Sequence, residues 1–245
     1  MPDSIILIDK PAGVTSFGVV ARLKRVLKER AGKKVKVGHT GTLDPFATGL
    51  MIIVTGNECK NAQNYSKLDK VYEAAIVLGQ TSTTGDPEGE IVEYARIANG
   101  RRNIGDGDLP NSNSQIPIVK TLEHPTIDSV QTMLQSFIGE IEQTPPIYSA
   151  IKINGQRAYK LARRGEEVVM PSRKVTIYSL EMLDYSWPEL KIRAHVSSGT
   201  YIRTLAEDIG SALGVGAYCR ELRRTKIADW SVDDAKTLAD FGIID

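Results

Sequence analysis

The sequence predicts an α+β fold in which helices pack on a mixed, mainly antiparallel central sheet. The segment KIRAHV (191–196) alternates polar and apolar residues, as a strand with one buried face does. Residues 17–30 place apolar side chains at a helical period. Strands and helices follow one another without the strict alternation of parallel sheets, so a mixed sheet is expected.

Five runs of residues predict the strands of this sheet. They lie at 5–8, 50–56, 71–78, 175–185 and 190–196. The first ends at the turn residues 9–13, and the second, LMIIVTG, is apolar enough to be a buried strand. The third carries Tyr72 near its start, and the last two are expected to be neighbours in the sheet.

Five segments predict helices. They lie at 17–30, 127–137, 156–164, 201–213 and, as a short last helix, 231–242. Ser16 is expected to cap the first helix, whose buried face should hold Phe17, Val20, Leu23 and Leu27. Gly165 and Gly214 are placed to end the third and fourth helices, and Ser231 is placed to cap the last.

Composition predicts a cytoplasmic protein without metal. Of 245 residues, 41% are hydrophobic and 25% are charged, which is ordinary for a globular chain. No run of 18 apolar residues and no signal peptide is present, so no membrane association is expected. Cys59 and Cys219 lie far apart, and the three histidines are scattered, so neither a disulfide framework nor a metal site is predicted.

Basic residues gather in three stretches although the net charge is only +1. Residues 22–36 hold eight lysines and arginines against one acid, residues 152–174 hold seven against two, and residues 220–226 hold four against one. Such segregation makes basic surface patches, which are typical of proteins that bind phosphate. A charge run is also an ordinary solvated face, so the pattern alone leaves both interpretations open.

Residues 99–120 differ in composition from the rest of the chain. They are rich in glycine, asparagine, serine and proline and have little apolar periodicity. We predict a flexible insertion here. We expect the whole chain, 1–245, to form a single catalytic domain that contains this insertion.

The most informative segment is GHTGTLDPFATG (38–49), which contains one acid, Asp44. Its glycines and its Asp-Pro pair predict tight turns, and the proline pushes Asp44 toward extended geometry. A carboxylate on a stiff loop beside a buried strand is a candidate nucleophile. An isolated Asp-Pro is more often an Asx turn, so further residues have to decide between the two.

Those further residues exist. GHTGTLDPFATGL resembles the catalytic motif of the TruB family of tRNA pseudouridine synthases, and other family blocks follow in order over about residues 4–235. The blocks are LIDKPAGVTS (7–16), DKVYEAAIVLG (69–79), QTPPIYSAIKINGQRAYKLARRG (143–165), SSGTYIRTLAEDIG (197–210) and the Leu-Arg-Arg of 222–224.

This resemblance implies a pseudouridine synthase fold and an isomerase that acts on uridine 55 in the T loop of tRNA. The isomerisation involves no redox change, so no cofactor is expected. The enzyme should work as a monomer on the T arm, without a protein partner. Many family members end in a small RNA-binding PUA domain, and we expect this chain, with nothing after Asp245, to lack it.

The resemblance also implies roles for individual residues. Asp44 is the essential acid, either as a nucleophile at C1′ or in an elimination through the 2′ position. Arg203 pairs with this aspartate, and Tyr72 stacks on the target base and could help to move a proton. The implied RNA and base contacts are His39 near the flipped base, Tyr201 and Leu222 at the uracil pocket, and Lys60 and Lys152 at the edge of the site.

Two other functions fit the same residues. One is an RNA-guided pseudouridine synthase of H/ACA particles, which shares these motifs. The other is a catalytically idle protein that binds or folds tRNA. Intact Asp44, Tyr72 and Arg203 favour an active enzyme over the second alternative.

Overall fold

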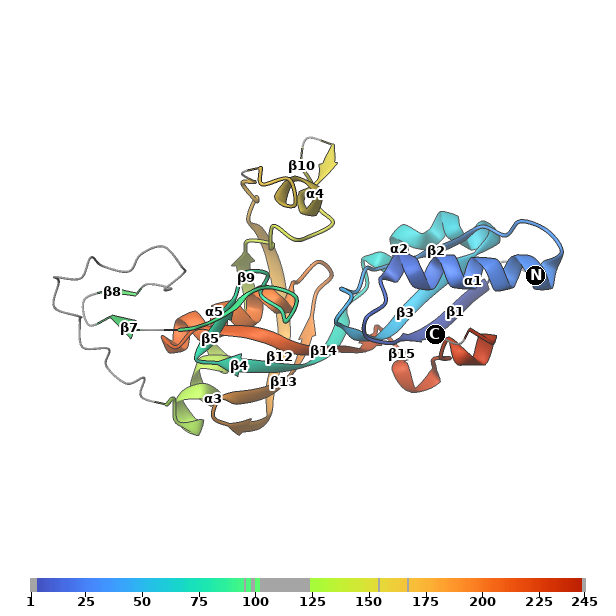
Figure 1. The fold of residues 1–245 in the computed structure, drawn as a ribbon. Helices are drawn as coiled ribbons and strands as arrows, with labels where there is room; N and C mark the ends of the chain where they lie inside the picture. Colours follow the sequence, from blue (N-terminus) through green and yellow to red (C-terminus); the bar gives the residue numbers. More distant parts are fainter. Residues whose placement is uncertain are drawn as a thin grey trace. The chain divides into compact units, whose positions relative to one another are not determined.

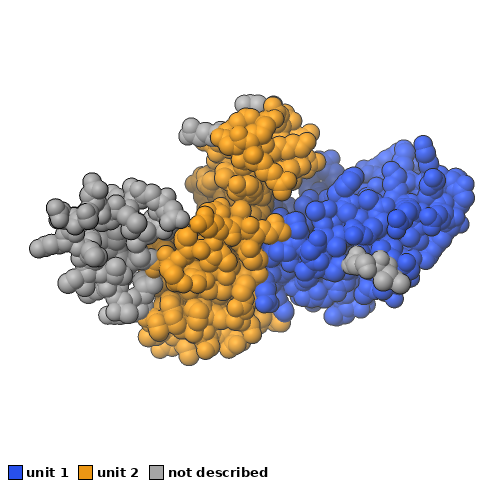
Figure 2. Space-filling view, viewed as in Figure 1, with its two compact units in different colours: residues 1–73, 194–199, 221–245 blue, residues 74–193, 200–220 orange. Residues whose placement is uncertain are grey.

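The computed structural model describes residues 4–94, 96–97, 100–101, 124–153, 155–166 and 168–243. Figure 1 shows the order of helices and strands, and Figure 2 shows the two compact units into which the chain divides. Unit 1 comprises Met1–Glu73, Ala194–Gly199 and Glu221–Asp245, and unit 2 comprises Ala74–Arg193 and Thr200–Arg220. The expectation of a single catalytic domain stays a prediction.

The main sheet confirms the predicted α+β class. Its strands are β1 (Ser4–Lys10), β2 (Val37–His39), β3 (Thr48–Thr55), β4 (Lys70–Leu78), β9 (Gly139–Gln143), β12 (Arg173–Ser186), β13 (Glu189–Val196), β14 (Ala217–Ile227) and β15 (Trp230–Ser231). The order is β1-β3-β14-β4-β13-β12-β9, with β2 paired to β3 and β15 to β14. β3 and β14 run parallel, whereas β1–β3, β2–β3, β9–β12 and β14–β15 are antiparallel.

Short pairs and helices complete the described fold. The pairs are β5 (Gln80–Ser82) with β6 (Ile91–Glu93), β7 (Arg96–Ile97) with β8 (Gly100–Arg101), and β10 (Lys152–Ile153) with β11 (Gln156–Arg157). The helices are α1 (Ser16–Ala31), α2 (Ala62–Ser66), α3 (Ile127–Ser136), α4 (Ala158–Ala162) and α5 (Ile202–Leu213), with 3-10 turns η1 (Gly56–Asn61), η2 (Val232–Asp234) and η3 (Ala239–Phe241). Among the residues described, no helix is both long and apolar enough to cross a membrane.

Strand β3 is buried, as its apolar sequence predicted. Leu50, Ile52 and Val54 pack with Ile227 and Val232. The intervening Met51 and Ile53 are also fully buried, so both faces of β3 are covered. Helix α1 contributes a further set of buried side chains, Val19, Val20, Leu23 and Leu27.

The start of α1 differs from its prediction in two ways. Thr15, not Ser16, caps the helix by accepting a hydrogen bond from Gly18 N. Ser16 instead turns inward and hydrogen-bonds both backbone groups of Leu43. Phe17, the next residue, lies about 100° further round the helix and is 74% exposed, so its predicted place in the core is wrong.

The C-terminal segment is two 3-10 turns rather than one helix. Ser231 caps the first turn, as predicted, by accepting from Asp233 N. The chain then runs beside β1, where Lys236 N donates to Leu7 O and Lys236 O accepts from Asp9 N. These strand-like bonds interrupt the helix that sequence spacing predicted.

Unit 2 contains α3, α4 and α5. Val130 and Leu134 of α3 are buried as predicted, and α5 ends at Gly214 in the left-handed conformation. Helix α4 begins later than predicted, because residues 156–157 pair with β10 instead. The predicted insertion at 99–120 lies outside the described residues except for Gly100–Arg101.

Candidate active site

The loop that carries Asp44 is held on both sides by residues of unit 1. On one side, Ser16 Oγ donates to Leu43 O at 2.8 Å and accepts from Leu43 N at 2.8 Å. On the other side, Pro45 O accepts from Gly13 N at 2.9 Å. Ala47 N closes the turn on Asp44 O at 3.2 Å. These bonds fix the backbone around a half-buried carboxylate, which is what a preoriented reactive group requires.

Lys10 places a buried positive charge under the same loop. Its side chain is fully buried, and Nζ donates to Pro11 O at 2.8 Å, Val14 O at 2.7 Å and Pro45 O at 3.1 Å. A buried ammonium is tolerated only when its donors are satisfied, and three backbone carbonyls do this here. Lys10 therefore ties the turn after β1 to the residue that follows Asp44.

Arg224 of β14 ties the two ends of the loop together. This arginine is 1% exposed, and it donates from Nε to Leu50 O at 2.7 Å and from Nη2 to Gly41 O at 3.3 Å. Its backbone lies against Gly49, its partner in the parallel β3–β14 register. Gly49 has φ +107°, and a Cβ there would lie 2.3 Å from Arg224 O, so only glycine fits.

Strand β4 brings Tyr72 into unit 1 beside the end of β14. Thr225 Oγ1 donates to Val71 O at 3.3 Å, and Tyr72 and Leu222 are both buried. Burial, reinforced by the positive charge of Arg224, lowers the pKa of Lys70 on this strand to about 8. Of the other predicted contacts, His39 pairs with Ile53 at the end of β2, and Lys60 is exposed on η1.

Arg203 lies at the start of α5 in unit 2 and is buried in an ion pair with Asp86. Arg203 Nη1 lies 3.0 Å from Asp86 Oδ2, and the two side chains are 3% and 5% exposed. The guanidinium also donates to Thr84 O at 2.9 Å and to Tyr148 O at 2.9 Å. Asp86 Oδ1 accepts from Thr84 Oγ1 and Glu88 N. This network fixes the guanidinium in place.

Asp86 is a residue that the sequence analysis missed. The segment TGDPEG contains an Asp-Pro pair like the one at Asp44, and this pattern could have indicated Asp86 as a candidate site residue. Its partner Arg203 lies 117 residues away along the chain, so no local pattern could predict the ion pair itself.

Glu207 lies one turn after Arg203 on α5 and adds a group that titrates near neutrality. Burial raises the pKa of Glu207 to about 7. The negative charges of Asp208 and Asp86 add to this rise, and the positive charge of Arg203 opposes it. Burial also raises the pKa of the neighbouring Asp208. Two acids on this part of α5 are therefore easier to protonate than ordinary carboxyl groups.

The raised pKa of Glu207 predicts a pH-dependent stability. Between pH 4.5 and 7 the folded state binds the proton more tightly than the unfolded state, so the stabilisation that protonation provides is lost as the pH rises through this window. Glu207→Gln should therefore raise the free energy of unfolding at pH 8 by up to about 3 kcal/mol, and the gain should shrink toward pH 4.5. Chemical denaturation at several pH values measures it, with Glu142→Gln at an exposed strand position as the control. A gain of equal size at pH 5 and pH 8 would contradict this assignment.

Tyr201, the residue before α5, is held by two neighbours in unit 2. Tyr201 N donates a hydrogen bond to Gln143 Oε1 at 2.8 Å, and Gln143 Nε2 donates one to Tyr201 O at 3.1 Å. The Arg173 guanidinium lies 4.9 Å from the centroid of the Tyr201 ring. Lys152, the remaining predicted contact, is exposed on β10.

The structure thus places the predicted residues in two groups. Unit 1 contains Asp44, Tyr72, His39, Leu222 and Lys60, and unit 2 contains Arg203, Tyr201 and Lys152. Within unit 1, β14 connects the Asp44 loop with the strand that carries Tyr72, because Arg224 bonds to Gly41 and Thr225 bonds to Val71. Within unit 2, Arg203 and Tyr201 share the start of α5. The pairing of Arg203 with Asp44 stays a prediction.

Two family models match nearly the whole chain. One, described as the N-terminal domain of the TruB family pseudouridylate synthases, matches residues 24–104 and 107–202. The other, described as the C-terminal domain of tRNA pseudouridylate synthase B, matches residues 203–243.

Individual proteins show the same similarity. The chain is 41% identical to a tRNA pseudouridine synthase B of Aromatoleum aromaticum, over 96% of this chain and 67% of the relative. It is 41% identical to a protein of that name from Phocaeicola vulgatus, over 97% and 91%. Among solved structures, a chain from a Cbf5-Nop10-Gar1 complex matches with a TM-score of 0.65 and 29% identity, over 96% of this chain and 52% of that chain. The chain thus spans about half the length of that structural neighbour.

Proposed function

Because the chain belongs to the TruB family of pseudouridylate synthases, we propose that it isomerises uridine 55 in the T loop of tRNA to pseudouridine. The observation that carries this proposal is the 41% identity, over nearly the whole chain, to proteins named tRNA pseudouridine synthase B. The enzyme acts in the cytoplasm, as a monomer, on the T arm and without a protein partner.

The reaction breaks the N1–C1′ bond of uridine and forms a C5–C1′ bond. C5 loses a proton and N1 gains one, so substrate and product have the same atoms and no cofactor takes part. The enzyme has to supply a group that acts at the sugar, a proton acceptor, and a pocket for a base removed from its stack.

Asp44 acts at the sugar in this proposal. It either attacks C1′ or assists an elimination through the 2′ position. The clamped backbone around it supports this role, because Ser16, Gly13 and Ala47 fix the loop before any substrate binds. An ordinary Asx turn needs no such connection to a helix and a buried arginine.

Arg203 keeps the Asp44 carboxylate ionised and oriented, and Tyr72 stacks on the target base. The ion pair with Asp86 supports the first role, because it holds the guanidinium rigidly and leaves few rotamers. Asp86 is thereby a positioning residue for Arg203. His39, Tyr201, Leu222, Lys60 and Lys152 contact the flipped base or the RNA around it.

A single assay tests the proposal against both alternatives. The purified chain is incubated with an unmodified tRNA transcript, with no other RNA and no other protein, and the product is mapped for pseudouridine. We expect one pseudouridine, at position 55. A reaction that starts only when a guide RNA is added would favour the RNA-guided class. Binding of tRNA without any product would favour the idle RNA-binding protein.

Tyr72 gives a further prediction about how the base is held. Tyr72→Phe keeps the ring and should retain substantial activity, whereas Tyr72→Leu should lose about tenfold or more because stacking is lost. Single-turnover rates on tRNA measure both variants, and their thermal midpoints show whether this buried position still packs. Equal losses in the two variants would mean that the hydroxyl matters more than the ring.

A further inference from the structure

One side of α1 is exposed along most of its length. Phe17, Ala21, Lys24 and Lys28 are spaced by four, three and four residues, so they lie in one stripe along the helix. All four are exposed, and Arg25 is exposed beside them. We call Phe17, Lys24, Arg25 and Lys28 the α1 stripe.

The positive charge of the stripe is not neutralised within the described part of the chain. There, none of Lys24, Arg25 and Lys28 forms an ion pair with an acidic side chain, and the same holds for the exposed Lys33, Lys34 and Lys36 that follow the helix. By contrast, Lys174, Lys191 and Arg193 of unit 2 each lie within 4.0 Å of a carboxylate. A concentrated charge of one sign attracts a polyanion.

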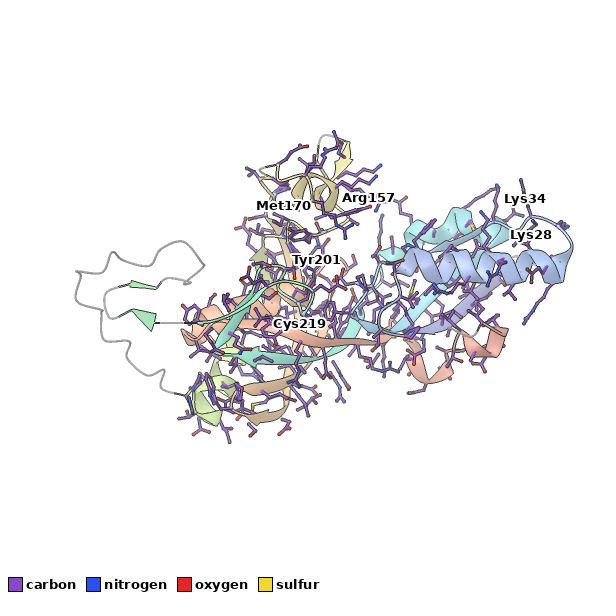
Figure 3. All side chains as sticks on the ribbon, in the orientation of Figure 1. Lys28, Lys34, Arg157, Met170, Tyr201 and Cys219 are labelled. Atoms are coloured by element: carbon purple, nitrogen blue, oxygen red, sulfur yellow. The ribbon has the colours of Figure 1, made fainter. Side chains whose placement is uncertain are left out.

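The stripe begins next to the Asp44 loop. Ser16, the residue before Phe17, bonds both backbone groups of Leu43, which precedes Asp44. Lys28 lies about 18 Å further along the axis of the helix, at 1.5 Å per residue. Figure 3 shows Lys28 on the last turns of α1 and Lys34 on the segment after it. The stripe thus leads away from the loop, and Phe17 stands at the end of the helix that contacts the loop.

We propose that the α1 stripe binds the tRNA outside the target nucleotide. Phe17 stacks on an unpaired base close to the Asp44 loop, and the three cations contact phosphates further along the RNA. This inference rests on the proposed function, which supplies the tRNA. An exposed aromatic ring followed by cations fits RNA better than an acidic protein surface, because a base offers both a face for stacking and an attached phosphate chain.

The test compares three sets of variants with the wild-type chain. Lys24→Gln, Arg25→Gln and Lys28→Gln are combined to remove three charges while keeping good helix formers. Lys174→Gln, Lys191→Gln and Arg193→Gln are combined as a control that removes the same charge from ion-paired positions. Phe17→Ala removes the ring, and Phe17→Tyr keeps it. Thermal midpoints check that each variant is folded.

The readouts are the dissociation constant for an unmodified tRNA transcript over a salt series and the single-turnover rate at saturating enzyme. The stripe triple variant should bind about tenfold or more weakly at low salt, and its logarithmic salt slope should fall by about two to three. Phe17→Ala should bind about tenfold more weakly, and Phe17→Tyr close to the wild type. The rate at saturation should not change, because the stripe does not touch the reacting atoms.

Several results would overturn the inference. An unchanged affinity and salt slope in the stripe triple variant would do so, as would an equal loss in the control triple variant. Polyglutamate that binds the stripe as tightly as tRNA would assign it to a protein partner instead. If the wild-type chain binds tRNA through the stripe but forms no pseudouridine, the proposed function is refuted while the inference about the stripe still holds. If the stripe variants keep both normal catalysis and normal tRNA affinity, only the inference that the stripe binds tRNA is refuted.

Discussion

Replacing Asp44 by asparagine should abolish pseudouridine formation. The amide keeps the size of the side chain but removes the charge, and neither a nucleophilic attack nor assistance of an elimination works without that charge. We expect a fall in the single-turnover rate of at least about a thousandfold. The loop itself should stay in place, because Ser16, Lys10 and Gly13 hold it through backbone atoms of Leu43 and Pro45, on either side of Asp44.

The rate, the tRNA affinity and the thermal midpoint should be measured on the same preparation. Asp184→Asn, at an exposed position of β12, makes the same chemical change away from the loop and should leave the rate unchanged. More than a trace of activity in Asp44→Asn, in a preparation free of the wild-type enzyme, would remove Asp44 from the catalytic role.

Gly49→Ala should be the most destabilising of the substitutions considered. A Cβ at this position would lie 2.3 Å from Arg224 O and 2.7 Å from Arg224 N, which are backbone atoms in a paired strand and have little freedom to move. The positive φ adds strain. We expect a loss of about 4 kcal/mol in the free energy of unfolding, or roughly 8–16 °C in thermal midpoint.

Gly13→Ala is the matched control for Gly49→Ala. Gly13 also has a positive φ, +78°, but a Cβ at this position would meet no other atom within 4 Å. Gly13→Ala should lower the free energy of unfolding only through backbone strain, by about 1–2 kcal/mol. Thermal unfolding of both variants separates strain from collision, and equal losses would show that the contact with Arg224 is easily relieved.

Elements with a strong local pattern were predictable from the sequence. The apolar run at 50–56 became β3, and the period of Val20, Leu23 and Leu27 identified the buried face of α1. Phe17 was misplaced because Ser16 sets the rotation of the first turn through its bonds to Leu43, a contact 27 residues away along the chain. Periodicity contains no information about such a contact.

The candidate site was predictable as a set of residues but not as a structure. The motif around Asp44 indicated the acid, yet nothing local indicated that Arg224 would bond to both Gly41 and Leu50. The ion pair of Arg203 with Asp86 was missed for the same reason. Both arginines are buried, whereas arginine is usually exposed, so composition gives the wrong expectation for them.

The bond from Arg224 to Leu50 has a consequence for how this chain is made. The two residues are 174 positions apart, so a ribosome that adds about 5–20 residues per second makes Arg224 roughly 9–35 s after Leu50. During that interval β3 has β1 and β2 as antiparallel partners but lacks the parallel partner that its buried edge requires. The segment that contains β1, β2 and β3 therefore exists with an apolar strand incompletely covered until β14 has been translated.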